Sequence, residues 1–274
     1  MASNQTTHLS DGMHRVAIAN QKGGVGKTTT TINLATALAA LKRRVLVVDL
    51  DPQGNASTGL GVPRTQRVRT TYDALMGGVT IDEATIETEI PGLSLVPSDI
   101  NLTGAEIELV DKPDRAFCLR DRLAGMTKEY DDLLIDCPPS LGILTLNAMV
   151  AVNALLIPLQ CEFFALEGLS QLMSNVERVR QNFNPNLKIK GILLTMYDQR
   201  NNLSAKVAAD VRAHLGSKVY DTVIPRNVRV SEAPSHGKPV LLYDHRSSGA
   251  QAYMRLVTEI RRRDADPPRP QAGR

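Results

Sequence analysis

The stretch NQKGGVGKTTT, residues 20–30, indicates how this chain folds. It follows an apolar run, RVAIAN (15–20), and precedes a helical pattern over 28–41. A glycine-rich turn between a buried strand and a helix is the usual setting of a phosphate-binding loop. Glycines let backbone N–H groups converge on an anion, and the helix N-terminus adds positive dipole character. The same setting predicts a strand–helix architecture on either side of the loop.

Apolar runs alternate with helical patterns from Arg15 to about Arg262. The predicted strands are 15–20, 44–50, 93–98, 132–139, 154–160, 189–195 and 218–225. The predicted helices are 28–41, 141–150, 166–183, 202–215 and 248–262. Unbroken apolar runs suit strands that are buried on both faces, and their alternation with helices indicates βαβ units. We predict an α/β fold with a doubly wound, mostly parallel twisted sheet and helices on both faces.

The domain organisation is predicted to be simple. Residues 15–262 are expected to form a single P-loop domain, residues 1–14 a flexible N-terminal tail, and residues 263–274 a disordered, proline-rich C-terminal tail. The region 63–114 is less regular, with two short helical patterns around one strand. It is interpreted as a cap beside the nucleotide site or as a decorated crossover.

The composition is that of an ordinary soluble globular protein, with 42% hydrophobic and 22% charged residues among 274. A net charge of +3 means that any nucleic-acid surface must be a local patch. Cys118, Cys137 and Cys161 are scattered among apolar neighbours, which favours reduced, buried thiols over disulfides. With no membrane-crossing segment and no secretory signal, we expect a cytoplasmic protein without a membrane partner.

If the loop is a P-loop, its residues are expected to contact the phosphates of a nucleotide and a metal ion. Lys27 is expected to reach the β- and γ-phosphates of ATP, and the Thr28 hydroxyl to ligate Mg²⁺. Thr29, the next residue, is expected to hydrogen-bond the α-phosphate. The backbone cradle is expected from four residues, Gly23, Gly24, Val25 and Gly26. The alternative is a glycine-rich turn that binds nothing.

The loop departs from the usual G-x-x-x-x-G-K-[ST] spacing at its start, where Gln21 replaces the first glycine and Lys22 follows. In this it resembles the deviant Walker A ATPases, the family of ParA and Soj, MinD and the nitrogenase iron protein. The resemblance implies that Lys22 crosses a dimer interface to the partner's ATP. The nucleotide would then control dimerisation, since the lysine completes a site only when two loaded subunits meet. The alternative is a solvated lysine.

Three carboxylates lie at the ends of two apolar strands that come after the loop in the sequence. Asp49 and Asp51 lie in VVDLDPQGN (47–55), and Asp136 lies in LLIDCPPS (133–140). In an open parallel sheet, groups at the carboxyl ends of strands meet the ligand. The two segments resemble the family's switches I and II. That resemblance assigns Asp51 to hydrolysis, and to Mg²⁺ through water, with Asp49 as a supporting group.

Asp136 resembles a Walker B carboxylate that holds Mg²⁺ through a water molecule. The alternative for Asp49 and Asp51 is that both only cap the following turn. Cys137 is expected to pack in the core rather than react, because it follows Asp136 by one residue and so lies on the opposite face of the strand from that carboxylate.

Longer segments narrow the resemblance to chromosomal ParA, also called Soj. They are DPQGNASTGLG (51–61), LTGAEIELV (102–110), CEFFALEGLSQL (161–172), LLTMYDQRNNLS (193–204) and IPRNVRVSEAPSHGKPVLLYD (224–244). This resemblance implies an ATP-bound homodimer that attaches to DNA inside the cell's nucleoid. A ParB-type partner would stimulate slow hydrolysis, releasing the DNA and segregating a chromosome or plasmid.

The same resemblance implies specific contacts outside the P-loop. Pro225 and Asn227 match adenine-contacting positions, with a plain turn before a helix as the alternative. Arg200 and Arg229 match positions that hold the phosphate backbone of non-specific double-stranded DNA, and either could instead be a solvated surface charge. Arg226 and Lys238 are further candidates on chemistry alone.

Four rival functions remain to be weighed. A MinD-like membrane ATPase needs a C-terminal amphipathic helix, which the prolines of DADPPRPQAGR (264–274) disfavour. An iron–sulfur carrier needs a different cysteine arrangement, although one cluster ligand per subunit stays open. A small-molecule phosphotransferase would need an acceptor pocket, for which region 63–114 leaves room. A nucleotide-dependent scaffold would need neither Lys22 nor Asp51.

Overall fold

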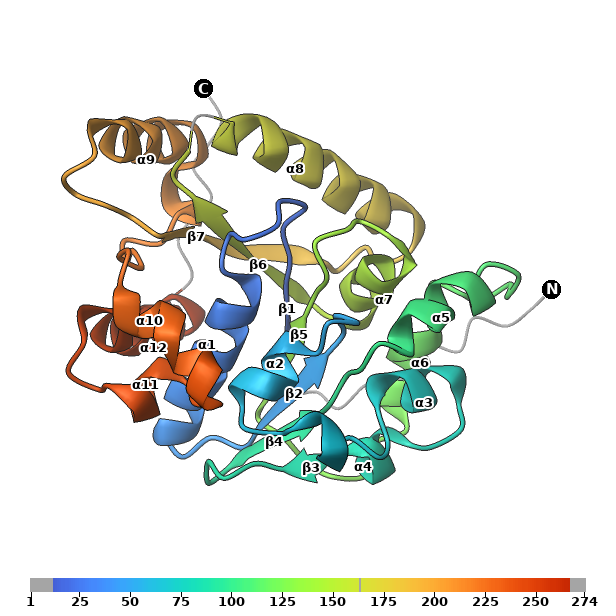
Figure 1. The fold of residues 1–274 in the computed structure, drawn as a ribbon. Helices are drawn as coiled ribbons and strands as arrows, with labels where there is room; N and C mark the ends of the chain where they lie inside the picture. Colours follow the sequence, from blue (N-terminus) through green and yellow to red (C-terminus); the bar gives the residue numbers. More distant parts are fainter. Residues whose placement is uncertain (1–11, 163, 267–274) are drawn as a thin grey trace.

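The computed structural model describes residues 12–162 and 164–266. In this part of the chain, helices pack on both faces of one seven-stranded sheet (Figure 1). The strands are β1 (His14–Ile18), β2 (Val45–Asp49), β3 (Ile86–Glu87), β4 (Leu93–Val96), β5 (Asp132–Asp136), β6 (Ala154–Gln160) and β7 (Lys188–Thr195). Their order in the sheet is β3-β4-β2-β5-β1-β6-β7. Among the strands of the described residues only β3 runs antiparallel to its neighbour, so the predicted doubly wound, mostly parallel α/β fold is confirmed.

The helices cover both faces of the sheet. The α-helices are α1 (Lys27–Ala40), α2 (Asn55–Gly59), α3 (Thr71–Met76), α4 (Ile81–Ala84), α5 (Leu102–Glu108), α6 (Cys118–Ala124), α7 (Ile143–Ala151), α8 (Ala165–Asn182), α9 (Asn202–Leu215), α10 (Val228–Glu232), α11 (Val240–Tyr243) and α12 (Ser248–Ala265). The described part of the chain also contains the short 3-10 helices η1 (Arg64–Gln66), η2 (Gly216–Lys218) and η3 (Ala233–His236).

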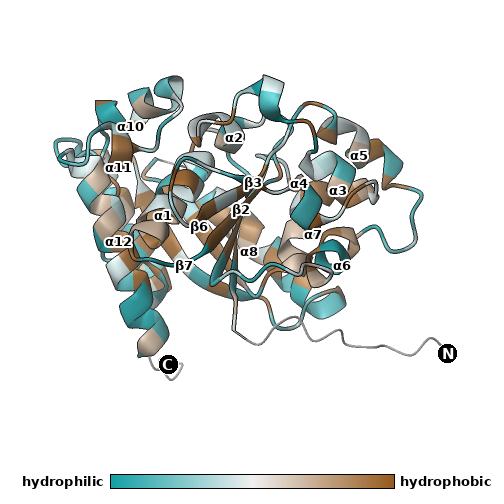
Figure 2. Cartoon of the chain, turned by 90° about the horizontal axis from the view of Figure 1, so that it is seen from below, coloured by the Kyte–Doolittle hydropathy of each residue, from teal (hydrophilic) through white to brown (hydrophobic). Residues whose placement is uncertain are grey.

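The sheet separates two apolar cores, as expected for strands without a polar face. One core packs α1 and α12 on one side of the strands, and the other packs α3 to α9 on the opposite side. Figure 2 shows the brown strands enclosed by helices whose outward faces are mostly teal. β1 lies between β5 and β6, so the loop that follows it opens at the carboxyl edge of the sheet beside the ends of β2 and β5. No helix among residues 12–162 and 164–266 is long and apolar enough to cross a membrane.

The predicted strand over 218–225 is wrong. The segment runs beside β7, but sheet pairing is limited to two isolated bridges, Ile192 with Val219 and, just beyond the end of β7, Tyr197 with Pro225. Between these bridges, the N–H groups of Asp221 and Thr222 donate to the Glu259 carboxylate of α12, at 2.8 and 2.9 Å. The sheet ladder is therefore interrupted by a side chain that sequence periodicity does not reveal.

Region 63–114 is more regular than predicted. The helical patterns over 70–78 and 101–110 form α3 and α5, and the strand over 93–98 forms β4. The antiparallel strand β3, the helix α4 and, outside this region, α2 and α6 were not predicted. Each of these four elements has at most seven residues, too few to show a helical or strand period.

The predicted domain limits differ slightly from the ends of the elements. α12 continues to Ala265 because Arg263 fixes its last turn, donating to the carbonyls of Ser217 and Val219 and pairing with Glu259 at 2.7 Å. At the other end, β1 begins at His14 and Met13 is buried. The remainder of both predicted tails, residues 1–11 and 267–274, lies outside the described residues.

The three cysteines are free thiols. Cys137 and Cys161 are buried as expected, whereas Cys118 is half-buried at the start of α6. Burial raises the pKa of the Cys137 thiol, with the nearby Asp136 carboxylate adding to the effect. A protonated, enclosed thiol agrees with the packing role expected for Cys137.

Candidate active site at the carboxyl edge of the sheet

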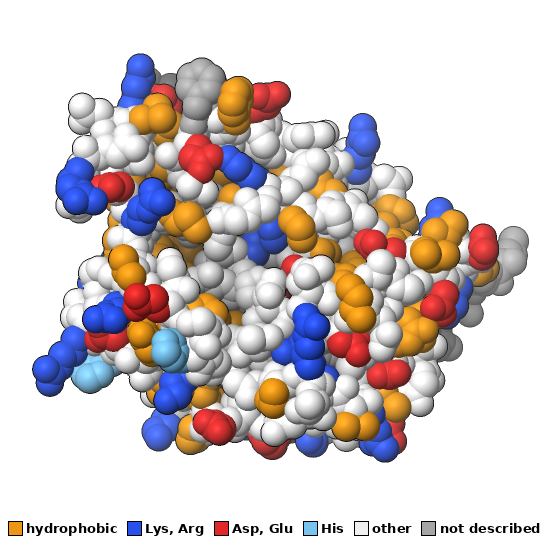
Figure 3. Space-filling view, in the orientation of Figure 1, with side chains coloured by type: hydrophobic (Ala, Val, Ile, Leu, Met, Phe, Trp, Pro, Cys, Tyr) orange, Lys and Arg blue, Asp and Glu red, His pale blue; other side chains and the backbone are white. Residues whose placement is uncertain are grey.

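The loop between β1 and α1 is held in a phosphate-binding shape by its glycines and by β7. Gly24 and Gly26 have φ values of 73° and 89°, which side chains other than glycine rarely adopt. The Thr195 hydroxyl, at the end of β7, donates to the carbonyl of Val25 at 2.8 Å. No side chain caps the N-terminus of α1, so its first N–H groups remain available to an anion. Near this point the face seen in Figure 3 is hollowed.

Lys27 is directed into this loop. Its side chain is buried, and its ammonium donates to the Lys22 carbonyl at 3.1 Å. Burial lowers the pKa of Lys27, and the Asp136 carboxylate opposes that change. The ammonium therefore occupies the concave side of the loop, where a phosphate oxygen could replace the carbonyl as its partner.

Asp136 and the start of α1 form a cluster of oxygen atoms. The Thr28 and Thr31 hydroxyls donate to the Asp136 carboxylate at 2.7 and 2.9 Å. Asp136 is fully buried at the end of β5, whereas Thr28 is partly exposed toward the loop. A hydroxyl and a carboxylate in contact beside a phosphate cradle fit Mg²⁺, which prefers oxygen ligands and retains several waters.

Asp49 lies beside Asp136 in the adjacent strand and has a structural role. The two residues are register partners between β2 and β5. The Asp49 carboxylate accepts from the backbone N–H and the hydroxyl of Ser57, at 2.8 and 2.7 Å, which ties α2 to the end of β2. Asp49 thereby fixes the segment that carries Asp51.

Asp51 is nearly buried, at 7% exposure, and its Oδ1 accepts from the Gln53 N–H at 2.9 Å. Its other oxygen, Oδ2, has no hydrogen bond within the described part of the chain. One oxygen of Asp51 therefore caps the turn, and a role of the other toward a ligand stays a prediction.

The buried carboxylates predict a pH-dependent stability. Burial raises the pKa of Asp136 to about 8, with the charge of Asp49 adding to the rise, against 3.8 for a free carboxyl. Burial likewise raises the pKa of Asp49 to about 6. Between the unfolded and folded pKa values the native state binds more protons, so stability falls as pH rises from about 4 toward about 8.

Without nucleotide and metal, the melting temperature is expected to fall between pH 5 and pH 8. Asp136→Asn should flatten this slope, while Glu129→Gln, which removes an exposed carboxylate, should keep it. Calorimetric scans of the three proteins test the assignment. Equal slopes for wild type and Asp136→Asn would show that Asp136 is ionised throughout the range.

Lys22 has a partner that the sequence interpretation missed. Its side chain is 46% exposed, and its ammonium pairs with the carboxylate of Glu162 in the loop after β6. The Lys22 N–H also donates to the Asn20 side chain at 3.0 Å. The sequence signal for Glu162 was its position just beyond the carboxyl end of a predicted strand, which is where the sheet places ligand-facing groups.

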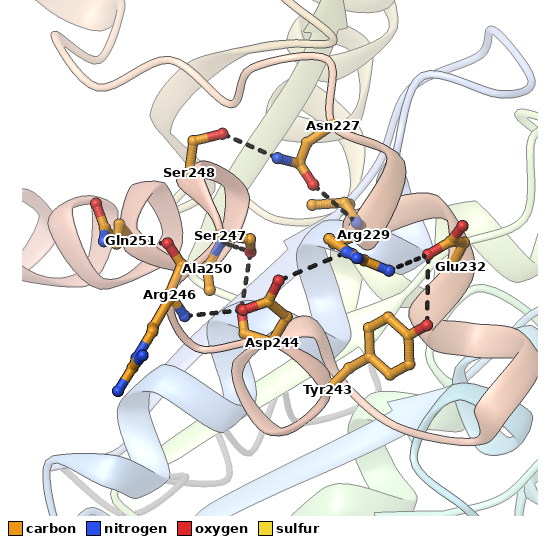
Figure 4. A network of polar contacts seen from close by, with 11 residues as sticks. Asn227, Arg229, Glu232, Tyr243, Asp244, Arg246, Ser247, Ser248, Ala250 and Gln251 are labelled. Atoms are coloured by element: carbon orange, nitrogen blue, oxygen red, sulfur yellow. Dashed lines mark hydrogen bonds and ion pairs between the residues drawn. The ribbon is translucent and has the colours of Figure 1, made fainter.

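Asn227 stabilises the fold at the start of α10 (Figure 4). Its side-chain oxygen accepts from the Val230 N–H at 3.3 Å, and its amide donates to the Ser248 hydroxyl of α12 at 2.9 Å. Pro225 is half-buried beside Tyr197. The structure thus brings the IPRN segment to β7, although both polar atoms of the Asn227 side chain are already engaged.

Arg200 lies in the loop before α9, and Arg229 lies in α10. Hydrogen bonds join Tyr197 to Ile224 and Arg226, which brings their segments together at the end of β7. Both arginines are paired with carboxylates of their own subunit. Arg200 contacts Asp198 at 3.1 Å, and Arg229 contacts Glu232 and Asp244 at 3.1 and 3.6 Å (Figure 4).

Their side chains are 90% and 53% exposed, respectively. Arg226 and Lys238 are surface residues of the same region. Figure 3 shows further Lys and Arg side chains along the left edge of the molecule, on the side of α9 to α12.

Comparisons with known proteins agree with this geometry. A family model described as an AAA domain matches residues 13–189. The chain is 61% identical over 253 residues to the chromosome partitioning protein ParA of Caulobacter vibrioides, covering 92% of this chain and 95% of that protein. It is 50% identical over 245 residues to the sporulation initiation inhibitor protein Soj of Bacillus subtilis, covering 89% and 97%.

Among solved structures, the cobyrinic acid a,c-diamide synthase of Mycobacterium smegmatis with bound ADP and magnesium superposes with a TM-score of 0.81. It is 38% identical in sequence, and the match covers 93% of this chain and 96% of that one.

Proposed function

This chain belongs to the ParA/Soj family of chromosome-partitioning ATPases, and from that premise we propose that its nucleotide state controls its attachment to DNA. ATP binding drives face-to-face dimerisation, and the dimer binds double-stranded DNA without sequence preference. Slow hydrolysis, stimulated by a ParB-type partner, returns the subunits to a form that leaves the DNA. The protein would act in the cytoplasm on the nucleoid, segregating a chromosome or a plasmid.

The cluster of Lys27, Thr28 and Asp136 beside an uncapped helix N-terminus carries the nucleotide part of the proposal. Lys27 would exchange its bond to the Lys22 carbonyl for β- and γ-phosphate oxygens, and Thr29 would contact the α-phosphate. Gly23, Gly24, Val25 and Gly26 would supply backbone N–H groups. Thr28 would ligate Mg²⁺ directly, and Asp136 and Asp51 through water. The metal, when bound, would neutralise charge on the terminal phosphates.

Lys22 is proposed to act in the partner subunit's site. In the single subunit its ammonium pairs with Glu162, so this contact has to open before Lys22 reaches another subunit's phosphates. Exposed ion pairs contribute little, about 0.2–1 kcal/mol, and a phosphate-bearing partner competes easily for the lysine. Glu162 therefore holds Lys22 reversibly while no second ATP-bound subunit is present.

Asp51 is proposed to orient the attacking water with its free Oδ2, while Asp49 keeps the segment in place through Ser57. For adenine, Pro225 offers a flat apolar surface. Asn227 would exchange its bond to the Ser248 hydroxyl for the base edge, because its amide is already engaged. This exchange couples nucleotide binding to the junction of α10 and α12.

Arg200 and Arg229 are proposed to contact DNA phosphates. Their ion pairs with Asp198, Glu232 and Asp244 reduce the positive field of a single subunit. A dimer doubles the number of arginines that face one duplex, and the affinity of such a surface rises with the number of phosphates contacted. ATP-driven dimerisation would therefore be enough to make the affinity for DNA depend on ATP.

Substituting Arg200 or Arg229 with alanine is expected to weaken ATP-dependent binding to non-specific duplex DNA at least about tenfold. The slope of log affinity against log salt concentration should decrease by about one for each phosphate contact that is lost. Binding would be measured by fluorescence anisotropy with ATP, ADP and no nucleotide, at two salt concentrations. Arg178→Ala, on the exposed side of α8, removes the same charge elsewhere and should bind as the wild type does. Equal losses in all three variants would place the DNA surface elsewhere, and no binding in any state would favour a phosphotransferase or a scaffold.

A further inference from the structure

Arg15 on β1 is a buried cation with no charged partner among the residues that the structure describes. Its side chain is only 5% exposed, and its guanidinium makes no hydrogen bond or ion pair with any described residue. Residues alternate between the faces of a strand, so Arg15 shares the face of Met13 and Ala17, which belong to the core packed by α6 and α7. Buried charges in proteins are ordinarily paired, because an unpaired one loses its hydration without compensation.

The nearby carboxylates are already engaged by other arginines. Arg44 contacts Glu129 and Asp131 at 3.3 and 3.2 Å, and Arg43 pairs with Asp132. Burial lowers the pKa of Arg15, and no carboxylate opposes that change. The structure therefore holds a desolvated guanidinium for which the described residues provide no counter-charge.

A cleft of about 550 Å³ opens beside Arg15. The Leu123 and Met126 side chains contribute apolar lining, and Arg15 and Lys128 contribute positive charge. Arg44 also lines the cleft, together with Glu129 and Asp131, the two carboxylates that it pairs with. The cleft lies at the amino edge of the sheet, where β1 and β5 begin, whereas the P-loop lies at the carboxyl edge. It is thus separate from the nucleotide site.

We propose that this cleft binds a small oxyanion, a ligand whose carboxylate or phosphate group pairs with the Arg15 guanidinium. Arginine suits such a group because its planar fork donates two parallel hydrogen bonds. The apolar lining from Leu123 and Met126 would contact the carbon skeleton of the ligand, and Lys128 would draw the anion in.

Thermal unfolding of the full-length chain, saturated with Mg²⁺ and ADP to occupy the P-loop, tests this proposal. Sodium phosphate would be titrated against sodium chloride at constant ionic strength, and sodium acetate in a parallel series. One or both oxyanions should raise the melting temperature saturably, by about 2 °C or more, and the more effective one identifies the group. The rise should persist in Arg178→Gln and vanish in Arg15→Gln, with ADP affinity confirming that each variant is folded.

A second variant, Arg15→Met, tests whether the guanidinium is unpaired in the free protein. Arg15→Met fills similar volume without charge, so in chloride alone its melting temperature should equal or exceed that of the wild type. A marked decrease would mean that the guanidinium is already paired in the free protein, and would overturn the proposal. The absence of any saturable response to phosphate or acetate, or an equal response in Arg15→Gln, would overturn it as well.

Discussion

Replacing Lys22 with alanine is expected to abolish ATP-dependent dimerisation while each subunit still binds ATP. Lys22 is exposed, and its contacts with the loop of its own subunit come from its backbone N–H and carbonyl, which alanine keeps. A positive charge supplied in trans to transferring phosphoryl groups is worth about 10³-fold or more in rate. Hydrolysis should therefore fall at least about 100-fold, and DNA binding should be lost with the dimer.

Glu162→Gln is the informative companion to Lys22→Ala. It removes the charge that holds Lys22 in the single subunit and leaves the lysine itself intact. ATP-dependent dimerisation should strengthen by up to about 30-fold, the value of two exposed ion pairs, one from each subunit. Sedimentation velocity with ATP and ADP measures both variants. A Lys22→Ala protein that forms no dimer and yet binds DNA as the wild type does would show that DNA binding does not require dimerisation, and would contradict the proposed coupling between them.

Asp51→Asn is expected to produce a protein that binds ATP, dimerises and attaches to DNA, but hydrolyses ATP at least about 100-fold more slowly. Asparagine keeps an oxygen that can accept the Gln53 N–H, so the turn after β2 is preserved. It removes the negative charge that orients water at Oδ2. The DNA complex should consequently persist long after the wild-type complex has been released.

Phosphate release under single-turnover conditions measures the chemical step of Asp51→Asn separately from dimer exchange. Gln53→Ala is the matched control, because it alters the exposed neighbour and keeps the backbone N–H that bonds Asp51. Unchanged hydrolysis in Asp51→Asn would reduce Asp51 to a turn cap and leave the water-orienting group to be found elsewhere.

The fold could be predicted from the sequence because its long elements carry strong periodic signals. The strand before the P-loop and the helix after it were placed within a residue or two, as were β6 and α9. The segment 218–225 could not be predicted correctly. Its apolar pattern is that of a strand, but the Glu259 carboxylate takes two of its N–H groups, and that contact joins residues 38 positions apart.

The candidate site could be predicted where it rests on local spacing. Lys27, Thr28 and Asp136 meet at the carboxyl edge as the strand–loop–helix pattern implied. The contacts between distant segments could not be predicted, among them Lys22 with Glu162, 140 residues apart, and Arg229 with Asp244. Side-chain pairing of this kind depends on which loops the sheet order brings together, and periodicity contains no information about it. The roles of Pro225, Asn227, Arg200 and Arg229 stay predictions.

The most direct test of the central claim is sedimentation velocity of the wild-type protein with fluorescent non-specific duplex DNA, in Mg²⁺ with ATP, with ADP and without nucleotide. A protein whose nucleotide state controls attachment should sediment as a single subunit with ADP or no nucleotide, and free of DNA. With ATP it should sediment as a dimer that carries the DNA, and added salt should release that DNA. Equal DNA binding in all three states, or DNA carried by the single subunit, would contradict the account.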